Sequence, residues 1–159
     1  MREKNYDREA VLAYARRWAL KRNPYYYDFE KLGGDCTNFA SQCIFAGAGV
    51  MNFTPQVGWY YRSAADRAAA WTGVEFLYRF LVGNRSAGPF GSLVSEREAE
   101  AGDIVQLGNK GGAFYHSPVI VSVAPICVAA HSFDAWDRPL ASYDYEKIRF
   151  IHIDGVRLW

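Results

Sequence analysis

The first half of the chain carries apolar residues at every third or fourth position, which is the spacing of one face of a helix. In the stretch from Tyr6 to Asn23 these residues are Val11, Leu12, Ala15, Trp18 and Ala19. Charged residues stand between them and Pro24 follows the stretch. The pattern therefore predicts an amphipathic helix that ends near Asn23.

Two further helices are predicted in this half of the chain. One covers Thr37–Gly47 and should end at Gly47 and Gly49. Its apolar stripe consists of Phe39, Ala40, Cys43 and Ile44. Another is expected to open at Thr72, because Thr72 and Glu75 have the spacing of a capping box. The apolar residues that follow this box are Phe76, Leu77 and Phe80.

The second half of the chain changes to short segments rich in Val and Ile, separated by Gly, Pro, Asn and Asp turns. These segments are Asp103–Leu107, Ser117–Val123, Ile126–His131 and Arg149–Ile153. We interpret them as strands. Helices in one half and strands in the other predict an α+β fold, in which an antiparallel sheet packs against a helical layer. Residues 1–159 are few enough to form one domain.

Composition narrows the classes of partner. Lys and Arg number 18 against 17 Asp and Glu, so no broad cationic field favours nucleic acid or anionic lipid. The longest apolar runs, such as Pro118–Val123, are too short to span a bilayer, and the residues after Met1 lack the pattern of a signal peptide. We expect a monomer that needs no cofactor. Its location would be extracellular or in the cell envelope if this sequence is a piece of a longer exported precursor.

Cysteine spacing gives no support to a disulfide-stapled fold or to a structural metal site. The chain holds 3 cysteines, so at least one must remain unpaired. Cys36 and Cys43 on one helix would lie about 10 Å apart along its axis, which is too far for a disulfide. Cys127 lies in a predicted strand. No CxxC pair or HExxH helix is present, so no metal is expected.

Cys36 stands in the stretch GGDCTNF, directly after a glycine turn and at the start of a predicted helix. The free N–H groups and the positive dipole end of a helix start favour thiolate over thiol, which predicts a lowered pKa and a nucleophilic sulfur. Gly33 and Gly34 would leave room for a substrate carbonyl. The alternative is that Cys36 is a small buried apolar residue, as many free cysteines are.

Two of the 3 histidines flank predicted strands. His116 opens one strand and His131 closes the next, so an antiparallel hairpin through Pro125 would bring them to the same edge of the sheet. His116 could then share the proton of Cys36, while His131 or the nearby Asp134 fixes its tautomer. Each histidine could instead be an ordinary turn or strand-end residue. His152 alternates with apolar neighbours and is expected to be structural.

These residues resemble a known family. GGDCTNFASQ, the later FYHS and a second histidine are similar to the bacterial amidase domain of the papain-like group, which is related to NlpC-type peptidases and CHAP amidases. AEAGDIVQLG is similar to the Gly-Asp turn that those enzymes carry before the histidine strand. The resemblance covers nearly the whole chain. It implies a papain-like fold, in which a helix bearing Cys36 packs on a sheet bearing His116.

The resemblance also implies an activity and a third catalytic residue. The implied activity is the cleavage of amide bonds, above all in cell-wall peptides, through a thioester on Cys36. NlpC-type enzymes commonly use histidine as the third residue, which would be His131, whereas related patterns use Asn, Glu or Asp and leave Asp134 as the alternative. Tyr26 and Tyr27 occupy the region where NlpC-type enzymes place a tyrosine near the active site, although either could be a packing aromatic.

Asp35 could contact a substrate amine, but helix capping through its carboxylate is the favoured role. Two rival classes remain open. A non-catalytic module could bind wall glycan or peptide through its aromatic residues, which include Trp59, Tyr60, Tyr61, Trp71 and Trp136. A transpeptidase would form the same thioester and transfer its acyl group to an amine instead of to water.

Overall fold

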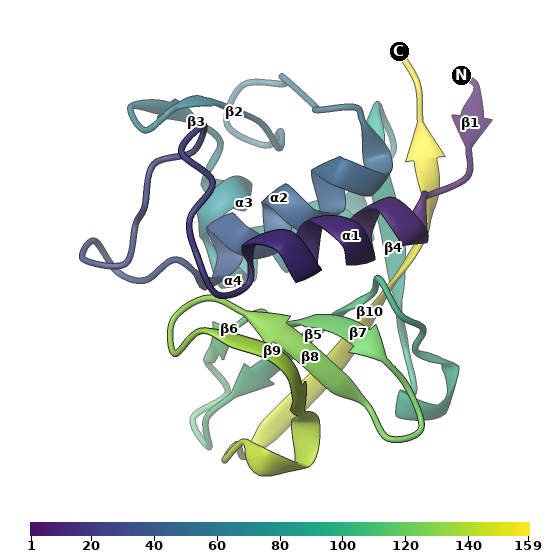
Figure 1. Ribbon diagram of the computed structural model, residues 1–159. Coiled ribbons are helices and arrows are strands. Elements are labelled where there is room, and N and C mark those ends of the chain that lie inside the picture. The colour runs from purple at the N-terminus through teal and green to yellow at the C-terminus, as the bar shows by residue number, and fades with distance from the viewer.

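The computed structural model describes residues 1–159 and shows a mixed α+β fold with a curled antiparallel sheet. The helices lie together on one side of the molecule, and most strands lie below them in Figure 1. The N-terminus and the C-terminus lie side by side, because β1 (Glu3–Lys4) pairs with the end of β10 (Lys147–Arg157). The α+β class predicted from the change of period is confirmed.

The first two helices pack directly against each other. The predicted first helix is present as α1 (Arg8–Trp18), but it ends at Trp18 and not near Asn23. The Asp7 side chain accepts a hydrogen bond from the amide of Ala10 at its start. The second is α2 (Cys36–Ala48), which ends at Gly49 in the left-handed conformation. Gly47 allows the close approach, because a Cβ atom there would lie 2.5 Å from Val11 Cγ2.

The third predicted helix is divided in two. α3 (Ala69–Thr72) ends where the capping box was expected to open a helix, and α4 (Val74–Gly83) follows it with Gly73 as the N-cap. The capping role predicted for Thr72 is therefore wrong. Its hydroxyl oxygen accepts a hydrogen bond from Arg67 Nε (3.1 Å), so it is not directed at the helix start. Of the apolar residues predicted to follow it, Leu77 and Phe80 are buried, whereas Phe76 is exposed.

The sheet has 8 strands, and β1, β10, β5, β7, β8 and β9 follow one another in that order. β4 also pairs with β10, and β6 pairs with β5. The remaining strand bounds are β4 Gly88–Val94, β5 Ile104–Gly108, β6 Phe114–His116, β7 Val119–Ser122, β8 Cys127–Ala130 and β9 Ala135–Pro139. A separate hairpin joins β2 (Tyr61–Ser63) to β3 (Asp66–Arg67). All four predicted strands are confirmed as β5, β7, β8 and β10, whereas β1, β2, β3, β4, β6 and β9 were missed.

The predicted hairpin between β7 and β8 is present and antiparallel. Val119 pairs with Ala129 and Ile120 pairs with Val128. This register brings the chain before β7, which holds His116, to the end of β8, which is followed by His131. The backbone arrangement expected from the sequence is thus correct. Whether the two side chains meet depends on what surrounds each ring.

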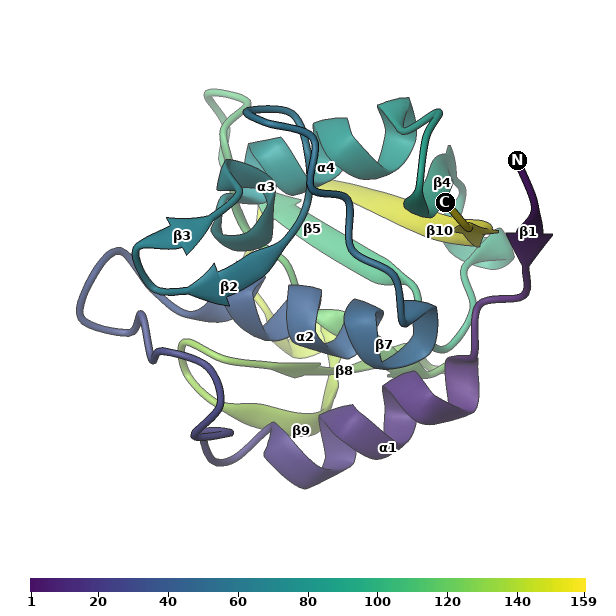
Figure 2. The same ribbon diagram turned by 90° about the horizontal axis from the view of Figure 1, so that it is seen from above.

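Apolar side chains form two cores on opposite faces of the sheet. The larger holds 23 buried residues and lies between the helices and the sheet, where α2 crosses the strands (Figure 2). The smaller holds 7 residues enclosed by the curl of the sheet. β5 contributes to both, since Ile104 belongs to the larger core and Val105 to the smaller. None of the helices combines the length and the apolar character needed to cross a membrane.

Candidate active site around Cys36

Cys36 is the first residue of α2, and its side chain is 9% exposed. Its Sγ atom lies 3.7 Å from Thr37 Oγ1 and 3.9 Å from the carbonyl oxygen of Tyr115. The Thr37 hydroxyl in turn donates a hydrogen bond to Ser117 Oγ. Tyr115 and Ser117 stand on either side of His116. The fold therefore places the sulfur against the short segment of chain that carries the predicted base.

Burial changes the expected charge of the thiol. The pKa of Cys36 is raised above its ordinary value, chiefly because burial disfavours the thiolate. Hydrogen bonds from Thr37 and from the Ser117 amide lower the pKa, but they do not outweigh burial. The prediction of a lowered pKa from the helix start alone is therefore corrected, since it ignored desolvation. In the free protein the sulfur is a protonated thiol.

His116 ends β6 and is 8% exposed. Its pKa is lowered to about 4, first by burial and then by the positive charge of Arg138. The ring is therefore neutral at pH 7, as a general base must be before it accepts a proton. It lies near the ring of Tyr143, with 5.8 Å between the two ring centroids. No hydrogen bond joins His116 to Cys36 in this structure.

Asp35 does not cap the helix that follows it. Its carboxylate makes no cap hydrogen bond, so the favoured prediction for this residue is wrong. Oδ1 instead accepts hydrogen bonds from the amide of Phe29 (2.8 Å) and from Asn38 Nδ2 (2.9 Å). Oδ2 lies 2.5 Å from His131 Nδ1. Asp35 is fully buried, so a substrate amine cannot reach it in this conformation either.

His131 is buried between α1 and α2, away from the partner predicted for it. Nδ1 contacts Asp35, and Nε2 lies 2.8 Å from the carbonyl oxygen of Trp18. The ring stacks on Phe39, with 4.0 Å between centroids. A carbonyl oxygen can only accept a hydrogen bond, so Nε2 carries a proton, and Nδ1 donates when Asp35 is ionised. Both ring nitrogens are thus engaged, and neither contacts His116.

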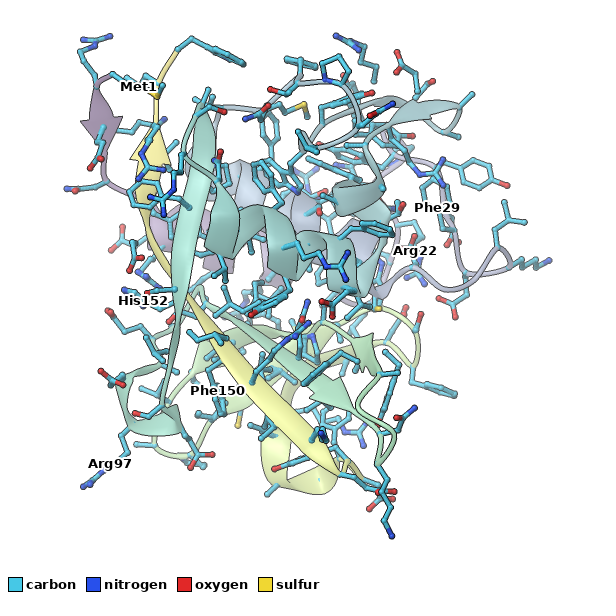
Figure 3. All side chains as sticks on the ribbon, turned by 180° about the vertical axis from the view of Figure 1, so that it is seen from behind. Met1, Arg22, Phe29, Arg97, Phe150 and His152 are labelled. Atoms are coloured by element: carbon cyan, nitrogen blue, oxygen red, sulfur yellow. The ribbon has the colours of Figure 1, made fainter.

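The alternative third residue, Asp134, pairs with Arg22. The Arg22 guanidinium donates to both carboxylate oxygens of Asp134, at 2.8 and 3.2 Å. Arg22 also lies within 4 Å of Asp28, Glu30 and Asp35. Figure 3 shows Arg22 and Phe29 close together where the loop between α1 and α2 projects from the molecule. Asp134 therefore ties the turn between β8 and β9 to this loop, and none of its contacts is with His116.

The two tyrosines of the loop take different positions. Tyr26 is a packing aromatic, because its ring stacks on Trp71 with 6.0 Å between centroids. The side chain of Tyr27 is 47% exposed. The backbone of Tyr27 is fixed, since its carbonyl accepts a hydrogen bond from Asn38 Nδ2 and its amide donates to the Tyr61 hydroxyl. Of the pair, only Tyr27 is free to contact a ligand.

Sequence reasoning missed the polar side chains that link α2 to the sheet. Thr37 Oγ1 donates to Ser117 Oγ at 3.3 Å, and Gln106 Nε2 donates to the same Ser117 oxygen at 3.1 Å. All three residues are buried. The sequence did contain a hint of this link, because a hydroxyl residue directly follows each predicted catalytic residue: Thr37 follows Cys36, and Ser117 follows His116. Tyr143 and Arg138, which surround His116, gave no such signal, because they follow it in the chain by more than one strand.

Three of the aromatic residues proposed for a binding module cannot contact a ligand. Trp59 and Trp71 are fully buried and Tyr61 is 6% exposed. Their rings pack together in the larger core, and only Tyr60 and Trp136 are partly accessible. No group of three or more His, Cys, Asp or Glu side chains is arranged to hold a metal ion. The cysteines form no disulfide.

Comparison with known proteins gives a family match over most of the chain. The sequence profile of the family described as "Putative amidase domain" matches residues 5–153. A protein of Bacillus subtilis (strain 168) named "Uncharacterized protein YhbB" is 27% identical over 144 residues, which are 89% of this chain. Those residues cover 45% of the Bacillus protein, so the chain spans less than half of that relative. No solved structure matches the chain.

Proposed function

The chain belongs to the amidase-domain family, and from this premise we propose that it cleaves amide bonds with Cys36 as the nucleophile and His116 as the base. One observation carries the proposal. The sulfur of Cys36, at the start of α2, contacts the carbonyl of Tyr115, and the neighbouring Thr37 hydroxyl donates to Ser117 Oγ, so the start of α2 contacts both chain neighbours of His116. These contacts support the proposal, because they hold the sulfur against the backbone of the segment that carries His116.

The charges of the free site favour a general-base reaction. Burial raises the pKa of the Cys36 thiol, while burial and Arg138 lower the pKa of His116 to about 4, so both groups are neutral at pH 7. His116 takes the thiol proton as the sulfur attacks the amide carbon. A thiolate and an imidazolium would therefore form only as substrate reacts, and the free enzyme would hold no thiolate–imidazolium ion pair.

The rest of the reaction follows from the same two residues. The carbonyl oxygen becomes an oxyanion, which the free N–H groups at the start of α2 stabilise. The carbon–nitrogen bond breaks as His116 gives its proton to the leaving amine, which leaves a thioester on Cys36. Water then attacks the thioester, with His116 accepting its proton, and the acid product leaves as the thiol is restored.

We assign His131 a positioning role that differs from the one predicted. Its contact with Asp35 fixes the residue immediately before the nucleophile, and Ser132 Oγ accepts a hydrogen bond from the Asp35 amide at 3.0 Å. The end of β8 therefore holds the start of α2 in place. Asp134 supports the same loop through Arg22. Tyr27, exposed beside the site, is the tyrosine that could contact substrate.

The proposed substrates are cell-wall peptides, on the strength of the resemblance to NlpC-type and CHAP enzymes. The papain-like arrangement of a Cys helix against a His sheet is part of the same proposal. Transfer of the acyl group to an amine uses the same thioester and differs only in the second nucleophile. The test must therefore distinguish hydrolysis from transfer.

The test is digestion of peptidoglycan fragments by the purified protein, with products identified by mass spectrometry. We expect new amine and carboxylate ends, one of each for every bond cut. Cys36→Ser should lower the rate by at least about 10³-fold, since a nucleophile cannot be bypassed by binding alone. The matched control is Cys127→Ser, because Cys127 is a half-buried thiol on β8 with no role in the reaction.

Parallel reactions with an added amine acceptor identify the second step. Adducts of the acceptor would show transfer, while unchanged products would show hydrolysis. Full activity in Cys36→Ser would contradict the proposed nucleophile. Absence of cleavage by the unaltered protein on every fragment tested would contradict the proposed substrate class.

A further inference from the structure

A cavity of about 530 Å³ lies away from Cys36, between α4 and the segment that follows α2. Figure 2 shows this segment running from the end of α2 across to α4. The volume is within the range of small-ligand sites. Neither Cys36 nor His116 is among the residues that line it. It is a separate place from the candidate active site.

One wall of the cavity is held in place by Asn52, which is 2% exposed. Its Nδ2 donates to Ser86 Oγ at 2.7 Å and to the carbonyl of Ala87 at 2.9 Å. Its Oδ1 accepts from the amide of Thr54 at 2.9 Å. Gln56, further along this wall, has a φ of 68°, a left-handed backbone conformation that costs a non-glycine residue energy.

The turn at the end of α4, next to Asn52, is fixed by Asn84. Its Nδ2 donates to the carbonyls of Ala87 (3.1 Å) and Pro89 (2.8 Å), and its Oδ1 accepts from the amide of Ser86 (3.0 Å). The turn that carries Arg85 is therefore rigid. Rigid walls reduce the ordering cost of binding, so a ligand that fits them loses little affinity to loop ordering.

The ionised side chains that line the cavity are both cationic. They are Arg79 and Arg85, and no Asp or Glu is among the lining residues. Arg85 forms no ion pair or side-chain hydrogen bond. Arg79 pairs with Glu75 at 3.4 Å, but Glu75 also receives a hydrogen bond from Arg149 at 3.0 Å. The carboxylate is thus shared, and the Arg79 guanidinium is not fully neutralised.

A second cavity of similar size, about 540 Å³, shows that this charge is not a general property of hollows on this molecule. Its lining contains Glu96 beside Arg97, so the two charges offset each other. The cavity next to α4 has two cations and no anion, together with an apolar base formed by Phe76, Phe80 and Ala70. These features are complementary to a small ligand with an oxyanion at one end and an apolar part at the other.

We propose that this cavity is a binding site for an anionic ligand, with the carboxylate or phosphate of the ligand held by Arg85 and Arg79. The planar guanidinium of arginine suits both anions, because it can donate two parallel hydrogen bonds to either. Phe76, whose side chain is 53% exposed, would cover the apolar part. The proposal does not depend on the activity proposed for Cys36.

The test is an NMR titration of the ¹⁵N-labelled protein with three probes at low salt. The probes are N-acetyl-alanyl-alanine with a free carboxylate, the same peptide as its C-terminal amide, and phenyl phosphate. We expect saturable shifts of the amide signals of Asn84, Arg85 and Ser86 with at least one anion and none with the amide. The anion that binds more tightly shows whether the site prefers a carboxylate or a phosphate. Added salt should weaken binding.

The variant Arg85→Gln should raise the dissociation constant by at least about tenfold, because it removes a charge-assisted hydrogen bond. Arg85 is exposed, so this change should leave the fold intact. The matched control is Arg97→Gln, an exposed arginine beside the other cavity, which should bind as the unaltered protein does. The proposal is overturned by equal binding of the amide, by absence of saturable shifts with both anions, or by unchanged affinity in Arg85→Gln.

Discussion

Two aspartate–histidine pairs stand in different parts of this molecule. Asp35 and His131 join the start of α2 to the end of β8, and both side chains are 1% exposed. Asp103 and His152 join β5 to β10 beside Arg8, at 2.9 Å, with the histidine 22% exposed. Figure 3 shows His152 on the opposite side of the molecule from Arg22 and Phe29, which contact Asp35.

The difference lies in what each histidine could do without its aspartate. His152 also lies within 4 Å of Glu100 and Asp154, and water reaches it, so other partners are available. His131 is enclosed by Phe39, Trp18 and Asp35, and its second nitrogen is already used. The same two residue types therefore form a pair with a partly exposed, replaceable histidine in one place and a pair with both members buried in the other.

The largest effect is expected for Asp35→Ala. This change leaves the buried His131 without its carboxylate, so the free energy of unfolding should fall by about 3–5 kcal/mol. Chemical denaturation followed by circular dichroism measures it. Asp28→Ala is the matched control, because Asp28 is an exposed aspartate of the same loop and should change stability by no more than about 0.5 kcal/mol. A loss below about 1 kcal/mol in Asp35→Ala would remove the distinction between the two pairs.

The pH dependence of activity extends the comparison to His116, which, unlike His131 and His152, has no carboxylate partner. Its pKa is lowered to about 4 from an ordinary 6.5, and a base acts only when unprotonated. The ratio kcat/KM should therefore stay level as pH falls from 7 to 5 and decline about tenfold per unit below 4. An acid limb centred near 6.5 would show that His116 is unshifted or is not the base.

The smallest effect is expected for His152→Ala. Because the ring is partly exposed and Arg8 still pairs with Asp103 at 2.8 Å, stability should fall by about 1 kcal/mol or less. Activity should be unchanged, since the pair lies far from Cys36. The same denaturation assay measures the first and peptide hydrolysis the second. A loss as large as that of Asp35→Ala would mean that partial exposure does not separate the two pairs.

Much of the fold could be predicted from the order of residues. The helical spacing of Val11 and Ala15 and the Val-rich runs of the second half fixed the α+β class and the β7–β8 hairpin. The missed strands have weaker local signals. β4 contains two glycines and a proline, which disfavour a strand, and it forms because β10 pairs with it along its length.

The candidate site was only partly predictable. Local sequence placed Cys36 at a helix start and His116 and His131 at the same end of a hairpin. It could not show which way each ring points, because that depends on residues remote in the chain. Trp18 accepts a hydrogen bond from His131 across 113 positions, and His116 is affected by Arg138 in β9 and Tyr143 after it.

The sequence by itself therefore determined the elements and the residues with reactive side chains, because spacing and turn residues act over short distances. The tertiary structure alone decided their charges and partners. Burial raised the pKa of Cys36 against the effect of the helix start, and it engaged Asp35 with His131 in place of a helix cap. Desolvation and pairing depend on everything that surrounds a group, and a linear pattern does not contain those surroundings.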